Sequence, residues 1–192
     1  MGLTEAEFRG LFDDHHWPLR AYVSRRVPNP ADAEDVVVEI FSVVWRRRDD
    51  LPTAPSDRRM WLYGVARLTV VNHHRSTSRF DRLNVRLAAQ ASPTPVVFEV
   101  DEIADTSVAM EALALLGESD KELIRLAVWE EFSHAEIAKV IGTSTPNVAV
   151  RLHRAKRRLR REFDRLVQGS SGNGQVVGEV STELTTEEET RR

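Results

Sequence analysis

The most informative segment of this sequence is Ser133-His-Ala-Glu-Ile-Ala-Lys-Val-Ile-Gly-Thr-Ser-Thr-Pro-Asn-Val148. Within it, Gly142 follows Ala138 by four residues, and Val148 follows the glycine by six. Two helices that cross steeply need a small side chain at their contact, a glycine that can take a positive φ at the turn, and an apolar anchor in the second helix. The spacing predicts a helix-turn-helix from Ser133 to Arg157, although other helical hairpins also use a glycine at the turn.

The second helix of this motif is strongly basic on one side. Thr145-Pro146 predicts its cap and first turn, and apolar residues recur from Val148 to Leu166 along a single stripe. Between Arg151 and Arg165 there are eight Lys or Arg residues against two carboxylates. Such a charge suits a phosphate backbone, although a merely solvated helix face has the same pattern. The predicted DNA-contacting residues are Thr145, Asn147, Arg151, Arg154 and Arg158.

A second amphipathic helix is predicted after Asn29-Pro30, which is a cap followed by a proline in the first turn. Apolar residues recur at helical spacing from Val37 to Trp45, so one side of this helix should be buried. The other side carries carboxylates, which can orient a basic protein partner or can simply be solvated. The candidates for this partner surface are Asp32, Glu34, Asp35 and Glu39.

A third helix is predicted beyond the breaker-rich stretch from Leu51 to Asp57. It combines aromatic with cationic side chains, a combination that suits separated nucleic-acid strands, where base stacking contributes about 1–3 kcal/mol per base. Trp61 can equally belong to the core. The candidates for contact with separated strands are Trp61, Tyr63, Arg67, Leu68, Asn72 and Arg75.

Helical signals continue along the remaining sequence, and no stretch shows the alternation of a half-buried strand. The predicted fold is therefore all-α, with two small helical domains. Pro18 predicts the start of a new helical segment, because proline fits the first turn of a helix and interrupts its interior. Capping boxes are predicted for Thr4 with Glu7, Ser119 with Glu122, and Ser133 with Glu136.

Composition separates the two domains. Ser92-Pro93-Thr94-Pro95 resists helix formation and is followed by an acidic stretch, which predicts a linker. Beyond Gln168 the residues are mainly Gly, Ser, Thr and Glu, which bury too little apolar surface to offset the entropy of ordering. The predicted organisation is a first domain over residues 4–79, a linker over 80–106, a second domain over 107–167 and a disordered tail over 168–192.

Bulk properties narrow the classes of function. The 192 residues carry a net charge of -3 and include no cysteine, which excludes a disulfide framework, thiolate catalysis and cysteine-ligated zinc. Neither an export signal nor a membrane span is visible, so we expect a cytoplasmic protein without a membrane partner. The pairs His15-His16 and His73-His74 diverge by about 100° on a helix and make weak metal chelates. We therefore expect no metal, no cofactor and no enzymatic activity.

In their order and separation, these motifs resemble the extracytoplasmic-function (group 4) sigma factors, members of the sigma-70 family of bacterial RNA polymerase. The segments 133–142 and 148–160 look like the family's region 4, whose helix-turn-helix reads the −35 element. The segments 30–36 and 41–45 look like region 2.2, which docks on the polymerase. The segment 61–67 looks like regions 2.3 and 2.4, which capture and open the −10 element.

The resemblance implies a subunit that binds the β′ clamp helices and the β flap of core RNA polymerase and directs initiation at promoter DNA. It also implies an anti-sigma factor as a candidate partner. Four positions depart from the family pattern and affect the expected −10 preference and some polymerase contacts. Leu68 stands where many members have asparagine, Asn72 where many have aspartate, and Val38 and Ile40 where a polar pair is usual.

The alternative is a conventional helix-turn-helix regulator that binds operator DNA without polymerase. Such a dimer would need half-sites about one helical turn apart, whereas a sigma factor contacts two dissimilar elements as a monomer. The second motif, over residues 30–67, favours the sigma factor. We expect the C-terminal tail to be a passive end rather than a regulatory handle.

Overall fold

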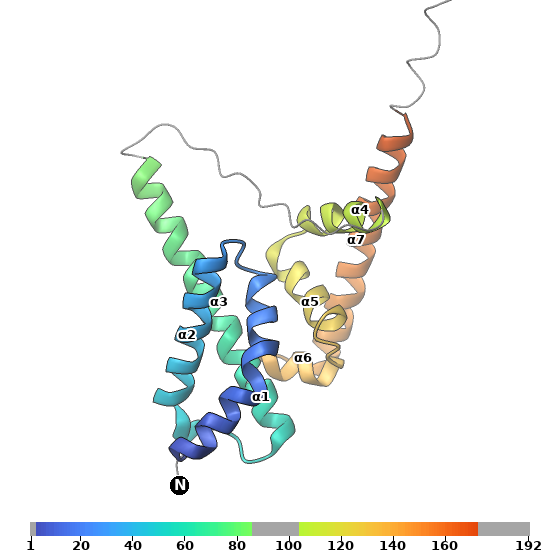
Figure 1. Cartoon of the computed structure of the whole chain (residues 1–192). Helices are drawn as coiled ribbons and strands as arrows, with labels where there is room; N and C mark the ends of the chain where they lie inside the picture. The colour runs from blue at the N-terminus through green and yellow to red at the C-terminus, as the bar shows by residue number, and fades with distance from the viewer. Residues whose placement is uncertain (1–2, 86–103, 173–192) are drawn as a thin grey trace, which may run out of the picture. The chain divides into compact units, whose positions relative to one another are not determined.

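The computed structural model describes residues 3–85 and 104–172, and over these two ranges the chain is helical without any strand, as the sequence predicts. Figure 1 shows the helices in chain order. They are α1 (Glu5–Ser24), α2 (Pro30–Arg46), the short 3-10 helix η1 (Arg48–Asp50), α3 (Pro55–Val85), α4 (Ala104–Ala114), α5 (Glu118–Val128), α6 (His134–Ile141) and α7 (Thr145–Gly172).

Three predicted helix starts are confirmed in atomic detail. Thr4 with Glu7, and Ser133 with Glu136, form reciprocal capping boxes at the starts of α1 and α6. Because each carboxylate accepts hydrogen bonds from the backbone and hydroxyl of its partner, the pKa values of Glu7 and Glu136 lie below their ordinary value. Asn29 caps α2 by accepting two backbone N–H bonds, at 2.8 and 3.3 Å.

The prediction that Pro18 begins a new segment is wrong, because α1 is one helix with Pro18 inside it. Proline within a helix costs about 3 kcal/mol. The residues that follow it outweigh this cost, since Leu19, Tyr22 and Val23 are 0% exposed and burial of each such side chain contributes roughly 1.5–3 kcal/mol. Tertiary packing therefore holds together a helix that the local sequence would interrupt.

Two helices begin earlier than predicted, α5 by two residues and α7 by one. α5 starts at Glu118, so Ser119 lies inside the first turn and the capping box predicted there is wrong. α7 starts at Thr145, and its first bond runs from the N–H of Val148 to the carbonyl of Ser144 at 3.1 Å, which places Ser144 in the cap position. Each site offers neighbouring polar residues, and local sequence does not choose between them.

By its contacts the chain divides into two compact units, residues 1–100 with 125–150, and residues 101–124 with 151–192. Both α5 and α7 run from one unit into the other. The helices also extend beyond the predicted bounds, because α3 continues to Val85, α4 begins at Ala104 and α7 continues to Gly172. The rest of the predicted linker and tail lies outside the described residues, and the domain bounds remain a prediction.

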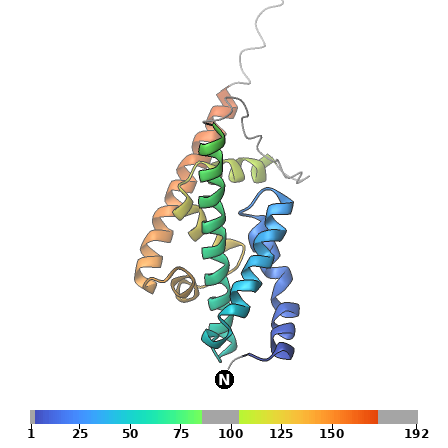
Figure 2. The same cartoon turned by 90° about the vertical axis from the view of Figure 1, so that its left-hand side faces the viewer.

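In the first unit, α1, α2 and α3 pack together around a core of large side chains. Figure 2 shows α1 and α2 beside α3, in agreement with the contacts among the three helices. α6 packs on α3, and the ammonium of Lys139 binds the carboxylate of Asp57 at 2.5 Å. The fully buried core side chains of these helices include Leu19, Tyr22, Ile40, Val44, Leu62 and Ile137.

The turn between α5 and α6 is held in the first unit by a buried carboxylate. The side chain of Glu130 is 4% exposed, and its two oxygens accept hydrogen bonds from Arg25 at 2.8 and 2.9 Å. Arg26, also buried, lies 3.4 Å from the same carboxylate. Beside it, Phe132 meets the ring of Tyr63 edge-on at 4.9 Å between centroids. Charge pairing and ring packing together hold this turn against the end of α1 and against α3.

The second unit contains α4, the first part of α5 and the long remainder of α7. Its core is built from small and branched apolar residues, of which Ala112 and Ala155 are 0% exposed and Leu123 is 1% exposed. Over the described residues, no helix is long and apolar enough to cross a membrane. Nor do His, Cys, Asp and Glu form a group of three or more that could hold a metal ion within residues 3–85 and 104–172.

Candidate nucleic-acid and protein interfaces

The turn between α6 and α7 has the backbone conformation that the sequence predicts. Gly142 has φ 70° and ψ 49°, in the left-handed region, and its N–H bonds to the carbonyl of Ala138. Ala138 is 5% exposed in α6, and Val148 is 0% exposed in α7. The small residue, the glycine and the apolar anchor thus take the three places that a helix-turn-helix requires.

The side of α7 that faces away from its buried stripe carries three free cations. Arg154, Arg157 and Arg161 are exposed, and none of them has an ion pair or hydrogen bond to a described residue. They follow one another at helical spacing, so they form a single row. Near the start of the same helix, Asn147 is exposed and donates an amide hydrogen to the hydroxyl of Thr143 at 2.9 Å.

Two of the predicted DNA-contacting arginines are engaged elsewhere in the second unit. Arg151 is half-buried and donates to the hydroxyl of Ser119 at 2.5 Å. Arg158 forms an ion pair with Asp120, on the first turn of α5. The hydrogen-bond donors of these two arginines are therefore already partly used within the second unit. Of the five predicted positions, Thr145 and Arg154 are exposed without a side-chain partner among the described residues, and Asn147 is exposed with its amide bonded to Thr143.

The acidic face of α2 is formed as predicted, but most of its carboxylates have partners. Glu34 binds Arg20 at 2.5 Å, and Glu39 binds Arg46 at 2.7 Å. Asp32 lies 3.9 Å from His73. Asp35 is exposed and has no ion pair or hydrogen bond to any described residue, so its charge is fully available to a partner.

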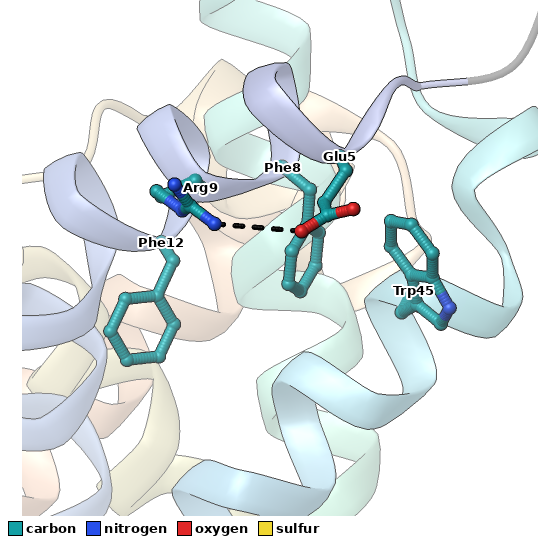
Figure 3. Close-up of a pocket in the computed structure, with 5 residues that line it drawn as sticks. All are labelled: Glu5, Phe8, Arg9, Phe12 and Trp45. Carbon is teal, nitrogen blue, oxygen red and sulfur yellow. Dashed lines mark hydrogen bonds and ion pairs between the residues drawn. The ribbon is translucent and has the colours of Figure 1, made fainter.

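Apolar side chains lie beside these carboxylates. Val38, on the outer side of α2, is 65% exposed, whereas Ile40 is fully buried in the core. Toward the end of α2, Trp45 forms a shallow groove with α1, with a volume of about 350 Å³. Figure 3 shows its lining, in which the ion pair of Glu5 with Arg9 lies above aromatic rings. The lining residues are Glu5, Phe8, Arg9, Phe12 and Trp45.

The candidates on α3 divide into surface and core residues. Trp61 is half-buried, with the guanidinium of Arg47 5.6 Å from its ring centroid. Tyr63 is 2% exposed between the rings of Tyr22 and Phe132, so the prediction that it meets separated strands does not fit its position. Burial also raises the pKa of its phenol.

The remaining candidates of α3 lie at its surface. Leu68 is 54% exposed, Asn72 and Arg75 are exposed, and Arg67 is half-buried. Their positions in the chain place Leu68, Asn72 and Arg75 on one side of the helix. This side is available to a ligand.

Sequence reasoning missed several exposed apolar residues in the candidate faces. Val150 is 50% exposed in α7, and Val38 and Trp45 are 65% and 38% exposed in α2. Apolar residues in an amphipathic helix are ordinarily assigned to the core. The position of Val150 in the helical repeat could have identified it as exposed. It lies between Val148 and Leu152 in the chain, but on the opposite side of the helix from the apolar stripe to which they belong.

Comparison with known proteins identifies the two helical parts. The family model for sigma-70 region 2 matches residues 11–80, and that for sigma-70 region 4 matches residues 108–159. The ECF RNA polymerase sigma factor SigL of Mycobacterium tuberculosis is 33% identical over 158 residues, which are 81% of this chain and 88% of SigL. The RNA polymerase sigma-E factor of Streptomyces coelicolor is 28% identical, with coverage of 72% and 76%.

Solved structures show the same fold. The sigma factor RpoE of Bartonella quintana, crystallised with the anti-sigma factor NepR, superimposes with a TM-score of 0.64 at 20% identity, over 82% of this chain and 97% of that one. CnrH, solved with the cytosolic domain of CnrY, gives a TM-score of 0.59 at 22% identity, with coverage of 84% and 90%. With both regions matched in their order, the chain belongs to the extracytoplasmic-function sigma factors of the sigma-70 family, the promoter-specific initiation subunits of RNA polymerase.

Proposed function

We propose that three helices divide the work of promoter-specific initiation. α2 docks on the β′ clamp helices of core RNA polymerase, α3 contacts the opened −10 DNA, and α7 enters the major groove of the −35 element. A further contact joins region 4 to the β flap. One observation carries this assignment: unpaired charges of opposite sign lie on separate helices, with Asp35 on α2 and Arg154, Arg157 and Arg161 on α7.

On α7, the −35 contacts come from the predicted set Thr145, Asn147, Arg151, Arg154 and Arg158, to which exposure adds Arg157 and Arg161. The side chains near the helix start meet base edges, and the cations further along meet phosphates. Arg151 and Arg158 reach DNA only by releasing Ser119 and Asp120. We therefore expect them to contribute less than Arg154.

On α3, the −10 contacts come from Trp61, Arg67, Leu68, Asn72 and Arg75, all of which are exposed or half-buried. Trp61 supplies an aromatic face for an unstacked base, with the adjacent Arg47 supplying positive charge. Tyr63 contributes indirectly, since its buried ring supports α3 from within the core.

The carboxylates of α2 that face a basic element of the polymerase are Asp32, Glu34, Asp35 and Glu39. Asp35 contributes most to this attraction, because no described side chain neutralises its charge. Exposed apolar groups beside an acidic rim are typical of interface anchors, which carry much of the binding energy once water is excluded. Val38, Trp45 and the groove beneath Glu5 therefore extend the docking face toward α1.

An anti-sigma factor is a candidate regulator, because the sigma factor RpoE was solved in complex with the anti-sigma factor NepR. We further propose that the protein acts in the cytoplasm and has no catalytic activity of its own, the chemistry of RNA synthesis belonging to the polymerase.

Run-off transcription with purified core enzyme and a promoter library tests the proposal. We expect initiation that depends on this protein and requires two separate promoter elements. A protein that never directs initiation but shifts DNA by itself as a dimer would instead act as an operator-binding regulator.

A further inference from the structure

One exposed apolar side chain lies on the outer side of α7, near its start. Val150 is 50% exposed, whereas Val148 and Leu152, two residues before and after it, are 0% and 3% exposed. Successive residues of an α-helix are rotated by about 100°, so Val150 is rotated by about 200° from each of these buried neighbours. It therefore points away from the core.

Val150 lies in line with the row of free cations, one helical turn before its first member. Arg154, Arg157 and Arg161 follow it by four, seven and eleven residues, so all four side chains lie along one line of the helix. Val150 is also close to the start of α7 at Thr145. In helix-turn-helix proteins this part of the second helix meets base edges. Val150 is thus placed at the level of the bases, with the cations placed to reach the backbone.

The polar neighbour of Val150 is already oriented. One amide hydrogen of Asn147, one turn earlier, is donated to Thr143 at 2.9 Å. The amide oxygen and the second amide hydrogen of Asn147 remain for hydrogen bonds to a base. The side chain of Val150 has no polar atom and makes no such bond. The branched methyl groups of valine match a different feature of the major groove, the C5-methyl group of thymine.

We propose that Val150 is a specificity-determining residue that contacts the C5-methyl group of a thymine in the −35 element. This inference rests on the proposed entry of α7 into the major groove. To that proposal it adds which base Val150 reads and which group of that base it contacts. The contact favours A·T pairs at one position without any hydrogen bond.

The test uses the intact protein with core polymerase on a promoter selected from the library. Each thymine of the −35 element on either strand is replaced in turn by deoxyuridine, which removes only the methyl group, and open-complex formation is measured. We expect one replacement to weaken promoter binding by about fourfold, the factor that corresponds to burial of one methyl group. In Val150→Ala, thymine and deoxyuridine at that position should be equivalent.

Val128→Ala is the matched control, because Val128 is a valine of similar exposure, 57%, that lies in α5. It should discriminate thymine from deoxyuridine as the unmodified protein does. The inference is overturned by a selected −35 element without thymine, by discrimination that persists in Val150→Ala, or by a Val150→Ala defect that is the same on every sequence. Each of these leaves polymerase-dependent initiation intact, so it is distinct from failure of the proposed function, in which no promoter is used.

Discussion

The charges around Glu130 and those on the outer side of α7 behave in opposite ways. At Glu130, one carboxylate and the guanidinium groups of Arg25 and Arg26 are drawn together at 2.8 to 3.4 Å, with the carboxylate 4% exposed. On α7, Arg154 and Arg157 point into solvent without a partner among the described residues. Burial forces a charge to be paired, whereas exposure leaves it for a ligand, so position and not residue type separates structural from functional charges.

The largest expected effect comes from breaking the buried cluster. Glu130→Gln removes the carboxylate charge that faces the buried guanidinium of Arg26 and the half-buried guanidinium of Arg25, and we expect a loss of about 3–5 kcal/mol in the free energy of unfolding. Urea denaturation followed by circular dichroism measures it. Glu131→Gln is the control, since the neighbouring side chain is exposed. Equal unfolding midpoints for the two variants would show that the cluster does not stabilise the fold.

Reversing the charge of the unpaired Asp35 carboxylate on α2 extends the comparison to a protein partner. Asp35→Lys should weaken binding to core polymerase by about tenfold, roughly 1.4 kcal/mol, because a cation would face the basic partner. The midpoint of thermal unfolding should be unchanged, since Asp35 has no internal partner. Anisotropy of labelled protein titrated with core enzyme measures the affinity. Asp13→Lys, on the exposed side of α1, should leave it intact, and an equal loss in both variants would reduce the effect to net charge.

The capping box of α6 tests an exposed charge that has a structural role. Ser133→Ala removes the hydroxyl that bonds to Glu136 and should lower the free energy of unfolding by about 1 kcal/mol near neutral pH. Because the pKa of Glu136 is lowered in the folded protein, its contribution is complete above the unfolded value of 4.5 and is lost as pH falls through the folded pKa.

The difference between Ser133→Ala and the unmodified protein should therefore shrink below pH 4.5. Glu136→Gln keeps an acceptor at this position but has no charge to lose, so its stability should vary less over that range. Urea titrations at several pH values measure both effects. A constant difference down to low pH would contradict the role given to the carboxylate.

The smallest expected effect separates two arginines of the same helix. Arg154→Ala should weaken promoter binding on all sequences and lower the slope of log affinity against log salt by about 1. Arg158→Ala should change the slope less, because Asp120 already neutralises that side chain. Filter binding of the holoenzyme over a salt series measures both. A larger change for Arg158→Ala would show that the ion pair opens on DNA.

Particular residues show how far the sequence could lead. Gly142, Asn29 and the boxes at Thr4 and Ser133 are all found in their predicted conformations. Tyr63 and Pro18 could not be placed, because their environments depend on Phe132 and on the packing of α1 against α2 and α3. For the candidate interfaces, the sequence predicted which types of residue are present. It did not predict which individual side chains have no partner among the described residues.

Most of the helices, three of their caps and the left-handed turn could be predicted from local sequence, because each depends on residues within about four positions of one another. Which charges form ion pairs within the protein depends instead on tertiary packing. Arg25 and Glu130 are 105 residues apart in the chain, and Arg158 and Asp120 are 38 apart. Such pairs depend on how distant segments pack and on how much water that packing removes, and this is why Arg158 is engaged while Arg154, four residues earlier on the same helix, has no partner among the described residues.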